Sequence, residues 1–335
     1  MIEILTGSAL NTVQDLGRTG FMNLGISHGG AMDRLAMAHG NILLGNPPDA
    51  AGIEVAFFPF RLRFHAPTSF ALTGARTTAR LDDLALPPDW AMTAQAGQTL
   101  SLGTPTCGAR AYVSFAGGLD VPIKLGSRST DLKGGFGGFL GRALQRGDRL
   151  DCLPADGAPP LPPHGFGLAR RTILPAREDA LHIRVLPAAE YASFTTGAQH
   201  RFVTQDWQVS ARANRAGYQF DGTAPLALSR PLNLFSHGIV PGTVQVPPAG
   251  MPIVQMADAN TCGGYPKIAT VIAPDLRLLA QAPVGTTVRF VAVTHAEAVA
   301  AVRDDARALA DLSRSIGALR GTLAIRPHPV STRPS

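Results

Sequence analysis

The chain has 335 residues, a length that predicts about two domains. Hydrophobic residues make up 45% of it, so a core can form without disulfides; charged residues make up only 16%, and there are 36 glycines and 27 prolines. This composition disfavours a disordered chain, a coiled coil and a helical bundle. It predicts a mainly β protein whose short strands are joined by many turns. The net charge of +6 comes from scattered arginines without a basic run, so nucleic acid is not an expected partner.

Three further sequence patterns indicate the compartment of the protein and the kinds of site it lacks. The first residues lack a basic segment and no apolar stretch approaches the roughly 18 residues of a membrane helix, which predicts a cytoplasmic protein without a membrane partner. The cysteines show no CxxC spacing and the histidines are dispersed, so we expect neither a disulfide framework nor a metal site. Lys133 precedes its glycines, so the chain has no P-loop.

We expect four units along the chain. Residues 1–155 predict an N-terminal β-rich domain with one helix, from about residue 31 to residue 44. Residues 156–178 are rich in proline and glycine and predict a linker, and residues 179–293 again read as strands. Residues 294–317 predict an amphipathic helix packed on the body. The capping box Thr294-His-Ala-Glu297 begins this helix and Gly317 is expected to end it.

Two segments of the first unit concentrate polar side chains and glycines. In one, Gln14, Asp15 and Arg18 place a carboxamide, a carboxylate and a guanidinium on one glycine-bounded turn. In the other, Arg128 stands among serine and threonine hydroxyls, before a glycine-rich run at 133–138 whose backbone N–H groups can approach an anion. Each segment suits a substrate site. The first also suits a plain turn with an internal Asp–Arg pair, and the second also suits a tight loop that needs glycine only for its backbone angles.

Two segments of the second unit have the same character. Asn214 and Arg215 adjoin after a strand-like run and can together bind a planar amide or a carboxylate. Gln245 lies between apolar residues, so its amide can face a pocket. Lys267 follows a rigid Gly-Gly-Tyr-Pro turn and is one of only three lysines in the chain, which favours a role in holding a carboxylate or transferring a proton.

At these segments the chain resembles the family of the C subunit of bacterial 5-oxoprolinase. The matching motifs occur in order between about residues 3 and 293. His237 and Cys262 depart from the family pattern, in which an acidic residue and a threonine are usual at these positions. The motifs are Thr12-Val-Gln-Asp-Leu-Gly-Arg18, Gly30-Ala-Met-Asp33, Gly45-Asn46, Ala116-Gly-Gly-Leu-Asp-Val-Pro122, Gly126-Ser-Arg-Ser-Thr130, Gly141-Arg142, Ile239-Val-Pro-Gly-Thr-Val-Gln-Val-Pro-Pro248 and Gly263-Gly-Tyr-Pro-Lys-Ile-Ala-Thr270.

The resemblance implies two cyclophilin-like β-barrel domains that meet at a cleft. It also implies that the chain is the C subunit of an ATP-dependent 5-oxoprolinase, which opens 5-oxo-L-proline to L-glutamate. The implied partners are the B and A subunits of 5-oxoprolinase, and ATP is expected through that complex. On this basis we expect Lys267, Gln245 and Asn214 to be catalytic. The residues expected to bind substrate are Arg128, Asp15, Arg18, Gln14, Arg215, Gly264 and Tyr265.

Two alternative functions remain within the same family. One is a carboxyltransferase subunit that moves a carboxyl group from carboxybiotin to urea or a related amide. Its biotin would sit on a separate carrier, because this chain lacks the Met-Lys-Met motif that accepts biotin. The other is a non-enzymatic antagonist of a sporulation-kinase inhibitor, which would bind its partner without any turnover.

Overall fold

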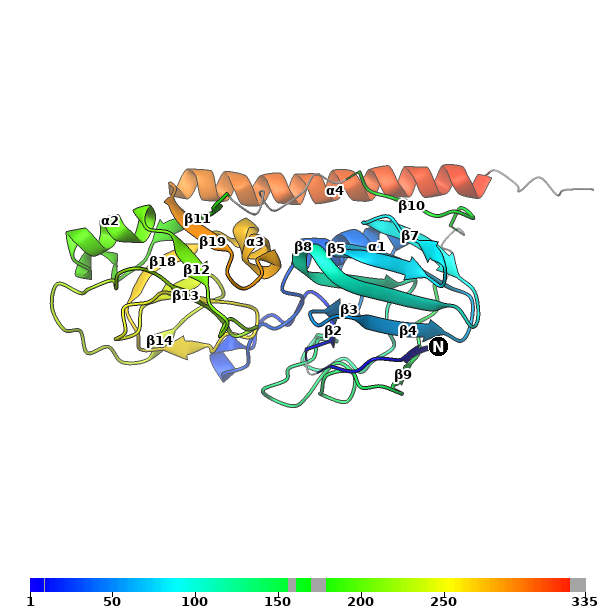
Figure 1. The fold of residues 1–335 in the computed structure, drawn as a ribbon, viewed down its shortest axis with the longest axis horizontal. Helices are drawn as coiled ribbons and strands as arrows, with labels where there is room; N and C mark the ends of the chain where they lie inside the picture. Colours follow the sequence, from blue (N-terminus) through cyan, green and yellow to red (C-terminus); the bar gives the residue numbers. More distant parts are fainter. Residues whose placement is uncertain (9, 156–160, 170–178, 326–335) are drawn as a thin grey trace, which may run out of the picture.

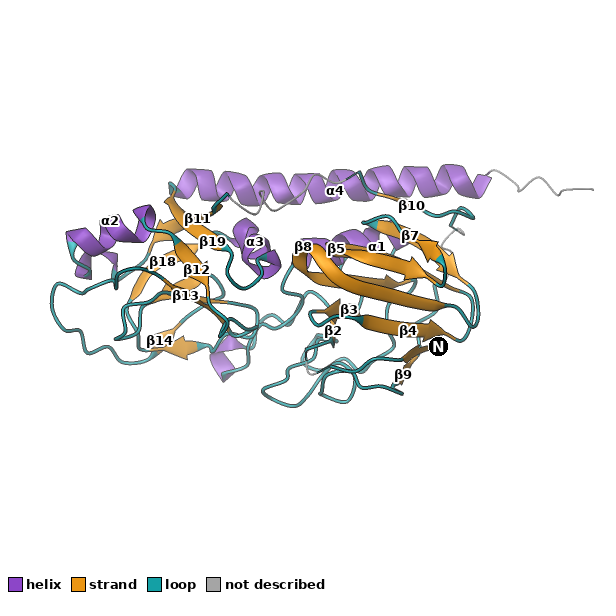
Figure 2. Ribbon diagram, in the orientation of Figure 1, coloured by secondary structure: helices purple, strands orange, loops and turns teal. Residues whose placement is uncertain are grey.

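The computed structural model describes residues 1–8, 10–155, 161–169 and 179–325. These residues form two β-rich halves that lie side by side, with one long helix running across both (Figure 1). Strands and loops dominate each half and helices are few (Figure 2). The prediction of a mainly β fold is therefore confirmed.

The first half is a ten-stranded sheet built around two long antiparallel strands, β5 and β8. Alternation along β4 shows how the sequence selects the buried face: Phe60, Leu62 and Phe64 are buried, while Arg61 and Arg63 point to solvent. The strands are β1 Ile2–Ile4, β2 Thr12–Gln14, β3 Gly52–Val55, β4 Phe60–Phe64, β5 Thr68–Leu81, β6 Leu84–Ala85, β7 Trp90–Ala94, β8 Thr99–Phe115, β9 Arg149–Leu150 and β10 Phe166–Gly167.

The second half is a closed barrel in the order β11-β18-β15-β16-β13-β12-β19. Its core includes Phe290, whose ring stacks on Phe202 and meets the edge of Phe220. A separate pair, β14 with β17, lies beside it. The strands are β11 Leu181–Pro187, β12 Trp207–Val209, β13 Gly217–Asp221, β14 His237–Gly238, β15 Thr243–Gln245, β16 Ile253–Gln255, β17 Cys262–Gly263, β18 Lys267–Val271 and β19 Thr287–Ala292.

The two halves differ in how completely their strands close. Two barrels were expected, and in the described residues the closed ring is that of the second half, whereas the first sheet is branched and ends at the short strands β9 and β10. Strand β10 lies inside the predicted linker and pairs with β7, so this part of the segment extends the first sheet. Residues 156–160 and 170–178 of that linker lie outside the described residues.

Short helices connect the strands. In α1, Arg34–Leu44, the Asp33 carboxylate accepts a hydrogen bond from the backbone N–H of Ala36, and Gly45 at φ 74° ends the helix in the left-handed conformation. The remaining short helices are α2 Thr196–Thr204, α3 Leu276–Gln281, and the 3₁₀ turns η1 Met22–Leu24, η2 Tyr191–Ser193 and η3 Ala273–Asp275.

The long helix α4, His295–Ile325, begins as predicted but ends later. The expected capping box is present, since Thr294 N–H donates to Glu297 at 2.7 Å and Glu297 N–H donates back to the Thr294 hydroxyl at 3.2 Å. The helix does not stop at Gly317, because Ile316 packs into an apolar cluster with α1 and the buried Arg320 donates to the Leu43 carbonyl at 3.1 Å. In the described part of the chain, no helix combines the length and apolarity needed to span a membrane.

Candidate functional site

In the first half, strand β2 and the loops between β8 and β9 lie on the side of the molecule away from α4 (Figure 1). Hydrogen bonds join loops of the first half to the second half. Lys133 Nζ of the glycine-rich loop donates to Asn260 Oδ1 of the second half at 2.6 Å. Gly29 N–H donates to the Ala257 carbonyl at 2.9 Å. The junction of the two halves is therefore where the candidate site residues of the first half meet the second half.

Asp15 organises the loop that carries Arg128. Its carboxylate accepts hydrogen bonds from the hydroxyl of Ser127 at 2.7 Å, from the hydroxyl of Ser129, and from the backbone N–H groups of Gly17 at 2.7 Å and Arg128 at 2.5 Å. Because these donors already occupy the carboxylate, Asp15 positions the loop and leaves little capacity for a ligand.

Gln14 is fully buried beside this loop. Its side-chain nitrogen donates to the Thr12 hydroxyl at 2.9 Å and to the Thr130 carbonyl at 3.3 Å, while its Oε1 atom has no donor among the described residues. The side-chain nitrogen of Gln14 therefore holds the loop in place, and only the side-chain oxygen remains available to a ligand.

Arg18 is fully buried, yet its guanidinium is only partly used. One nitrogen, Nη2, donates to the Ser129 carbonyl at 2.6 Å, and the Phe136 ring lies over the guanidinium at 4.8 Å. Nε and Nη1 have no hydrogen-bond acceptor among the described residues, and Nη1 lies 3.9 Å from the Asp131 carboxylate. Burial lowers the pKa of Arg18, and the charges of Asp131 and Asp15 only partly offset that effect.

Arg215 contrasts with Arg18, because every part of its guanidinium is paired. It donates to Glu54 at 2.5 Å, to both oxygens of Asp258 at 2.7 and 2.8 Å, and to the Gly30 carbonyl at 2.8 Å. Burial disfavours the charged form, but the charges of Glu54 and Asp258 outweigh burial and raise the pKa of Arg215. Glu54 belongs to the first half and Arg215 to the second, so this network joins the halves.

Lys267 and Gln245 form a second cluster on adjacent strands of the barrel. The register pairs the two residues directly, and both are buried. Lys267 Nζ donates to the Tyr265 carbonyl at 3.2 Å and lies 3.6 Å from Glu190, which also accepts the Lys267 N–H at 2.9 Å. The Gln245 Oε1 atom accepts from Gln255 at 3.1 Å. A cation, a carboxylate and carboxamides thus meet at one place in the barrel.

The remaining predicted residues lie at the edges of these clusters. Asn214 is exposed, and its side chain bonds within its own turn, to the N–H of Ala216 at 2.8 Å and the carbonyl of Arg212 at 3.1 Å. Tyr265 is 48% exposed, and a side chain at Gly264 beside it would meet the Leu234 carbonyl. Arg128 is partly exposed and contributes its backbone N–H to Asp15.

Among the described residues, no hydrogen bond or ion pair joins the Lys267 cluster to Arg18 or Arg215. The expected site residues therefore fall into separate groups: two at the junction of the halves and one in the barrel.

The glycine-rich loop differs from its expected role as an anion cradle. Gly134 N–H donates to the Asp131 side chain at 2.8 Å, Gly135 N–H donates to the Asp131 carbonyl at 2.9 Å, and Gly141 N–H donates to the Gly137 carbonyl at 2.9 Å. These amides are already used inside the loop, so they are not free to bind a phosphate or carboxylate.

Sequence reasoning missed four acidic residues at these sites: Glu54, Asp131, Glu190 and Asp258. A signal existed for Glu54, since it interrupts the apolar strand Gly52–Val55 with a charge that must be paired once buried. Glu190 gives no such signal, because it lies 77 residues from Lys267 in sequence. Within the described residues, no group of histidine, cysteine or acidic side chains has the arrangement of a metal site.

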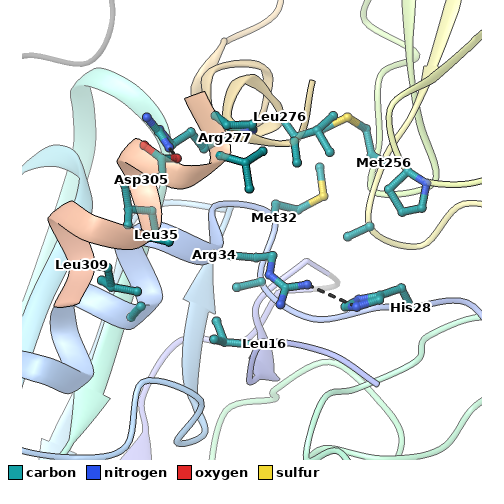
Figure 3. A pocket seen from close by; sticks show the side chains of 18 of the residues that line it. Leu16, His28, Met32, Arg34, Leu35, Met256, Leu276, Arg277, Asp305 and Leu309 are labelled. Atoms are coloured by element: carbon teal, nitrogen blue, oxygen red, sulfur yellow. Dashed lines mark hydrogen bonds and ion pairs between the residues drawn. The ribbon is translucent and has the colours of Figure 1, made fainter. Parts of the chain in front are cut away.

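A pocket of about 480 Å³ lies between the halves and beneath α4 (Figure 3). Its walls come from the start of α1, from η3 and α3, from α4 and from the loop that contains His28. None of the site residues expected from the sequence lines this pocket.

Comparisons with known proteins give a consistent result. The family described as carboxyltransferase domain, subdomain A and B, matches residues 24–292. The C subunit of the Escherichia coli 5-oxoprolinase is 42% identical over 312 residues, which cover 92% of this chain and 96% of the relative. The C subunit of the Haemophilus influenzae 5-oxoprolinase is also 42% identical, over 89% of this chain and 93% of the relative.

A more distant likeness extends to much longer proteins. The crystal structure of the Kluyveromyces lactis urea amidolyase superposes with a TM-score of 0.84 at 27% identity, over 93% of this chain. That match covers 20% of the urea amidolyase chain, so this chain spans about a fifth of its length.

Proposed function

We propose that this chain, which belongs to the family of the carboxyltransferase domain, subdomain A and B, acts as the C subunit of a cytoplasmic 5-oxoprolinase. The observation that carries the proposal is the 42% identity to the C subunit of a known 5-oxoprolinase over 96% of that protein's length. Since the relatives are named as subunits, we further propose that this chain works in a complex with the B and A subunits.

The proposed reaction opens the lactam of 5-oxo-L-proline to L-glutamate at the expense of ATP. A lactam carbonyl is a stable amide, and phosphoryl transfer from ATP makes it electrophilic enough for water to attack. In the glycine loop at 133–138, the amides of Gly134 and Gly135 already donate to Asp131, which leaves fewer N–H groups of this loop for ATP phosphates. We therefore assign this chain the handling of the lactam and derive no phosphoryl-transfer step from its residues.

We propose that the Lys267 cluster binds the substrate. The Lys267 ammonium would hold the substrate carboxylate, and the carboxamide of Gln245 can both donate to a lactam carbonyl and accept from a lactam N–H. Glu190 lies 3.6 Å from the ammonium and would orient the Lys267 side chain when no substrate is bound. Arg18 is the second proposed ligand-binding residue, because two of its buried nitrogens lack an acceptor.

The test is reconstitution with separately purified A and B subunits, measuring ATP-dependent release of glutamate from 5-oxo-L-proline. We expect turnover with the native chain and at least roughly a tenfold loss in Lys267→Ala, the scale of losing a charged hydrogen bond. The matched control is Lys124→Ala, because Lys124 is exposed and its described hydrogen bonds use only its backbone. No turnover by the native complex would refute the function. Normal turnover by Lys267→Ala would refute the site alone.

The likeness to urea amidolyase favours one further candidate, a carboxyltransferase that uses carboxybiotin and urea or a related amide. In that case, the native chain with its partner would consume carboxybiotin on a separate carrier and would release no glutamate. Measuring both products in the same reconstitution separates the two functions.

A further inference from the structure

The pocket beneath α4 has the dimensions and lining of a small-molecule site. Its volume of about 480 Å³ falls in the range of roughly 300–1,000 Å³ that such sites occupy. Met32 and Leu276 project into it from opposite walls, and Leu309 of α4 faces it as well (Figure 3). Most of the wall is therefore apolar and favours an apolar ligand body.

The helix that covers the pocket leaves apolar surface open to it. Val302 of α4 lines the pocket and is 46% exposed, so apolar surface of the helix is accessible to solvent at the pocket. Farther along, Ile316 and Arg320 hold the same helix firmly on α1. The pocket is thus covered by a helix that is held in place and that presents accessible apolar surface to it.

The pocket also contains a cation that forms no ion pair with a carboxylate of the described residues. This cation is Arg34, the first residue of α1, which is exposed, donates to Nε2 of His28 at 3.2 Å and feels the charge of Asp15 without contacting it. The other arginine of the pocket, Arg277, is paired with Asp305. The positive end of the α1 dipole cannot offset the charge of Arg34, because it has the same sign.

His28 does not neutralise this charge either. Its Nδ1 atom lies 3.2 Å from the Gly29 carbonyl, so Nδ1 carries the proton and Nε2 accepts from Arg34. Burial, together with the charges of Arg34 and Arg18, lowers the pKa of His28 and keeps the ring neutral. A net positive charge thus remains at one end of an apolar pocket.

We propose that this pocket binds a monocarboxylate with an apolar chain of medium length. Its carboxylate pairs with Arg34, and its chain lies between Met32, Leu276 and the underside of α4. This site is separate from the proposed lactam site, because Lys267 and Gln245 do not line it. The compact lactam of 5-oxo-L-proline would place a polar carbonyl and N–H against the apolar wall without partners, which disfavours it as the occupant.

The test uses calorimetry on the complete purified chain without any partner, with decanoate and decanol as probes at concentrations below micelle formation. We expect saturable decanoate binding in the micromolar range and at least about tenfold weaker binding of decanol, because the alcohol cannot form the charged hydrogen bonds. In Arg34→Gln, decanoate should bind no more tightly than decanol.

Two further variants keep the result interpretable. Ala306→Trp adds bulk to the pocket from α4 and should abolish binding of both probes, while its exposed helical position leaves folding intact, as circular dichroism would verify. Arg303→Gln removes an arginine of α4 that does not line the pocket and should bind decanoate normally.

Absence of saturable decanoate binding to the native chain would overturn the proposal, and so would equal binding by native and Arg34→Gln chains. Neither outcome bears on glutamate release in the reconstituted complex, so this proposal and the proposed function fail separately.

Discussion

Arg215 and Arg18 are both buried arginines at the junction of the two halves, yet their surroundings differ. Arg215 donates to two carboxylates and a carbonyl, and it ties the first half to the second. Arg18 donates to one carbonyl and keeps two nitrogens without acceptors among the described residues. A buried charge is tolerated when its hydrogen bonds are complete, and an incomplete set leaves a cost that a ligand oxygen can remove.

The comparison separates structural from functional polarity in one region of the molecule. Each guanidinium nitrogen of Arg215 has an acceptor without any ligand, which favours a structural role in holding the two halves together. The Arg18 group is incomplete, and the loop that covers it reaches across to the second half through Lys133 and Asn260. The predictions below test this division, beginning with the largest effect on stability.

The largest effect is expected for Arg215→Met. This change removes the ion pairs that Arg215 forms with the buried Glu54 and the half-buried Asp258, and leaves Glu54 with Arg110 at 3.8 Å as a more distant cation. Breaking a buried ion pair in this way costs about 3–5 kcal/mol of unfolding free energy. Chemical denaturation followed by fluorescence would measure it. The control is Arg212→Met, three residues earlier, whose ion pair with Asp221 is exposed and contributes about 0–1 kcal/mol. Equal losses in the two variants would contradict a structural role for the network.

Arg18→Met should change stability little and reduce activity strongly. The variant loses one hydrogen bond but also removes two buried nitrogens that lack acceptors, so we expect stability to change by less than about 2 kcal/mol. Asp15 and Asp131 keep hydrogen bonds from neighbouring groups, which limits the damage. Activity of the reconstituted complex should fall at least roughly tenfold. A destabilisation as large as that of Arg215→Met, with activity per folded molecule unchanged, would assign Arg18 a structural role.

A smaller effect is expected on the pH dependence of stability. It comes from His28, which lies near both Arg18 and Arg34. The folded protein lowers the pKa of His28 below its ordinary value of 6.5, so the unfolded chain binds this proton more readily than the folded chain does. Stability from this group is therefore complete above pH 6.5 and decreases as the pH falls below that value. Denaturation midpoints between pH 7.5 and 5.5 should decrease less in His28→Gln than in the native chain. Parallel curves would show that His28 does not titrate differently on folding.

The sequence predicted local structure well where neighbouring residues decide it. The capping box at Thr294 and Glu297 and the stop at Gly45 follow from side chains and φ angles within a few residues, and both are present. The prediction that the last helix ends at Gly317 is wrong. The packing of Ile316 and the hydrogen bond of Arg320 to α1 outweigh the weak tendency of glycine to end a helix.

Candidate polar residues could be found from the sequence, but their roles could not be assigned from it. Asp15 was expected to bind substrate, yet its carboxylate is occupied by the Ser127 and Ser129 hydroxyls, more than a hundred positions away. The glycine-rich loop was expected to offer free amides, yet those of Gly134 and Gly135 donate to Asp131. Each polar group can form only a limited number of hydrogen bonds, so its role depends on which partners the folded structure places within reach.

By itself, the sequence determined the mainly β character, the C-terminal end of α1, the start of α4 and the motifs that the chain shares with its family. These depend on composition and on residues close together in the chain. Only the tertiary structure decided which buried arginine is complete, because Glu54 reaches Arg215 across 161 residues, and it alone created the pocket beneath α4. Such contacts arise when the sheet, the barrel and the helix dock, and no local pattern specifies them.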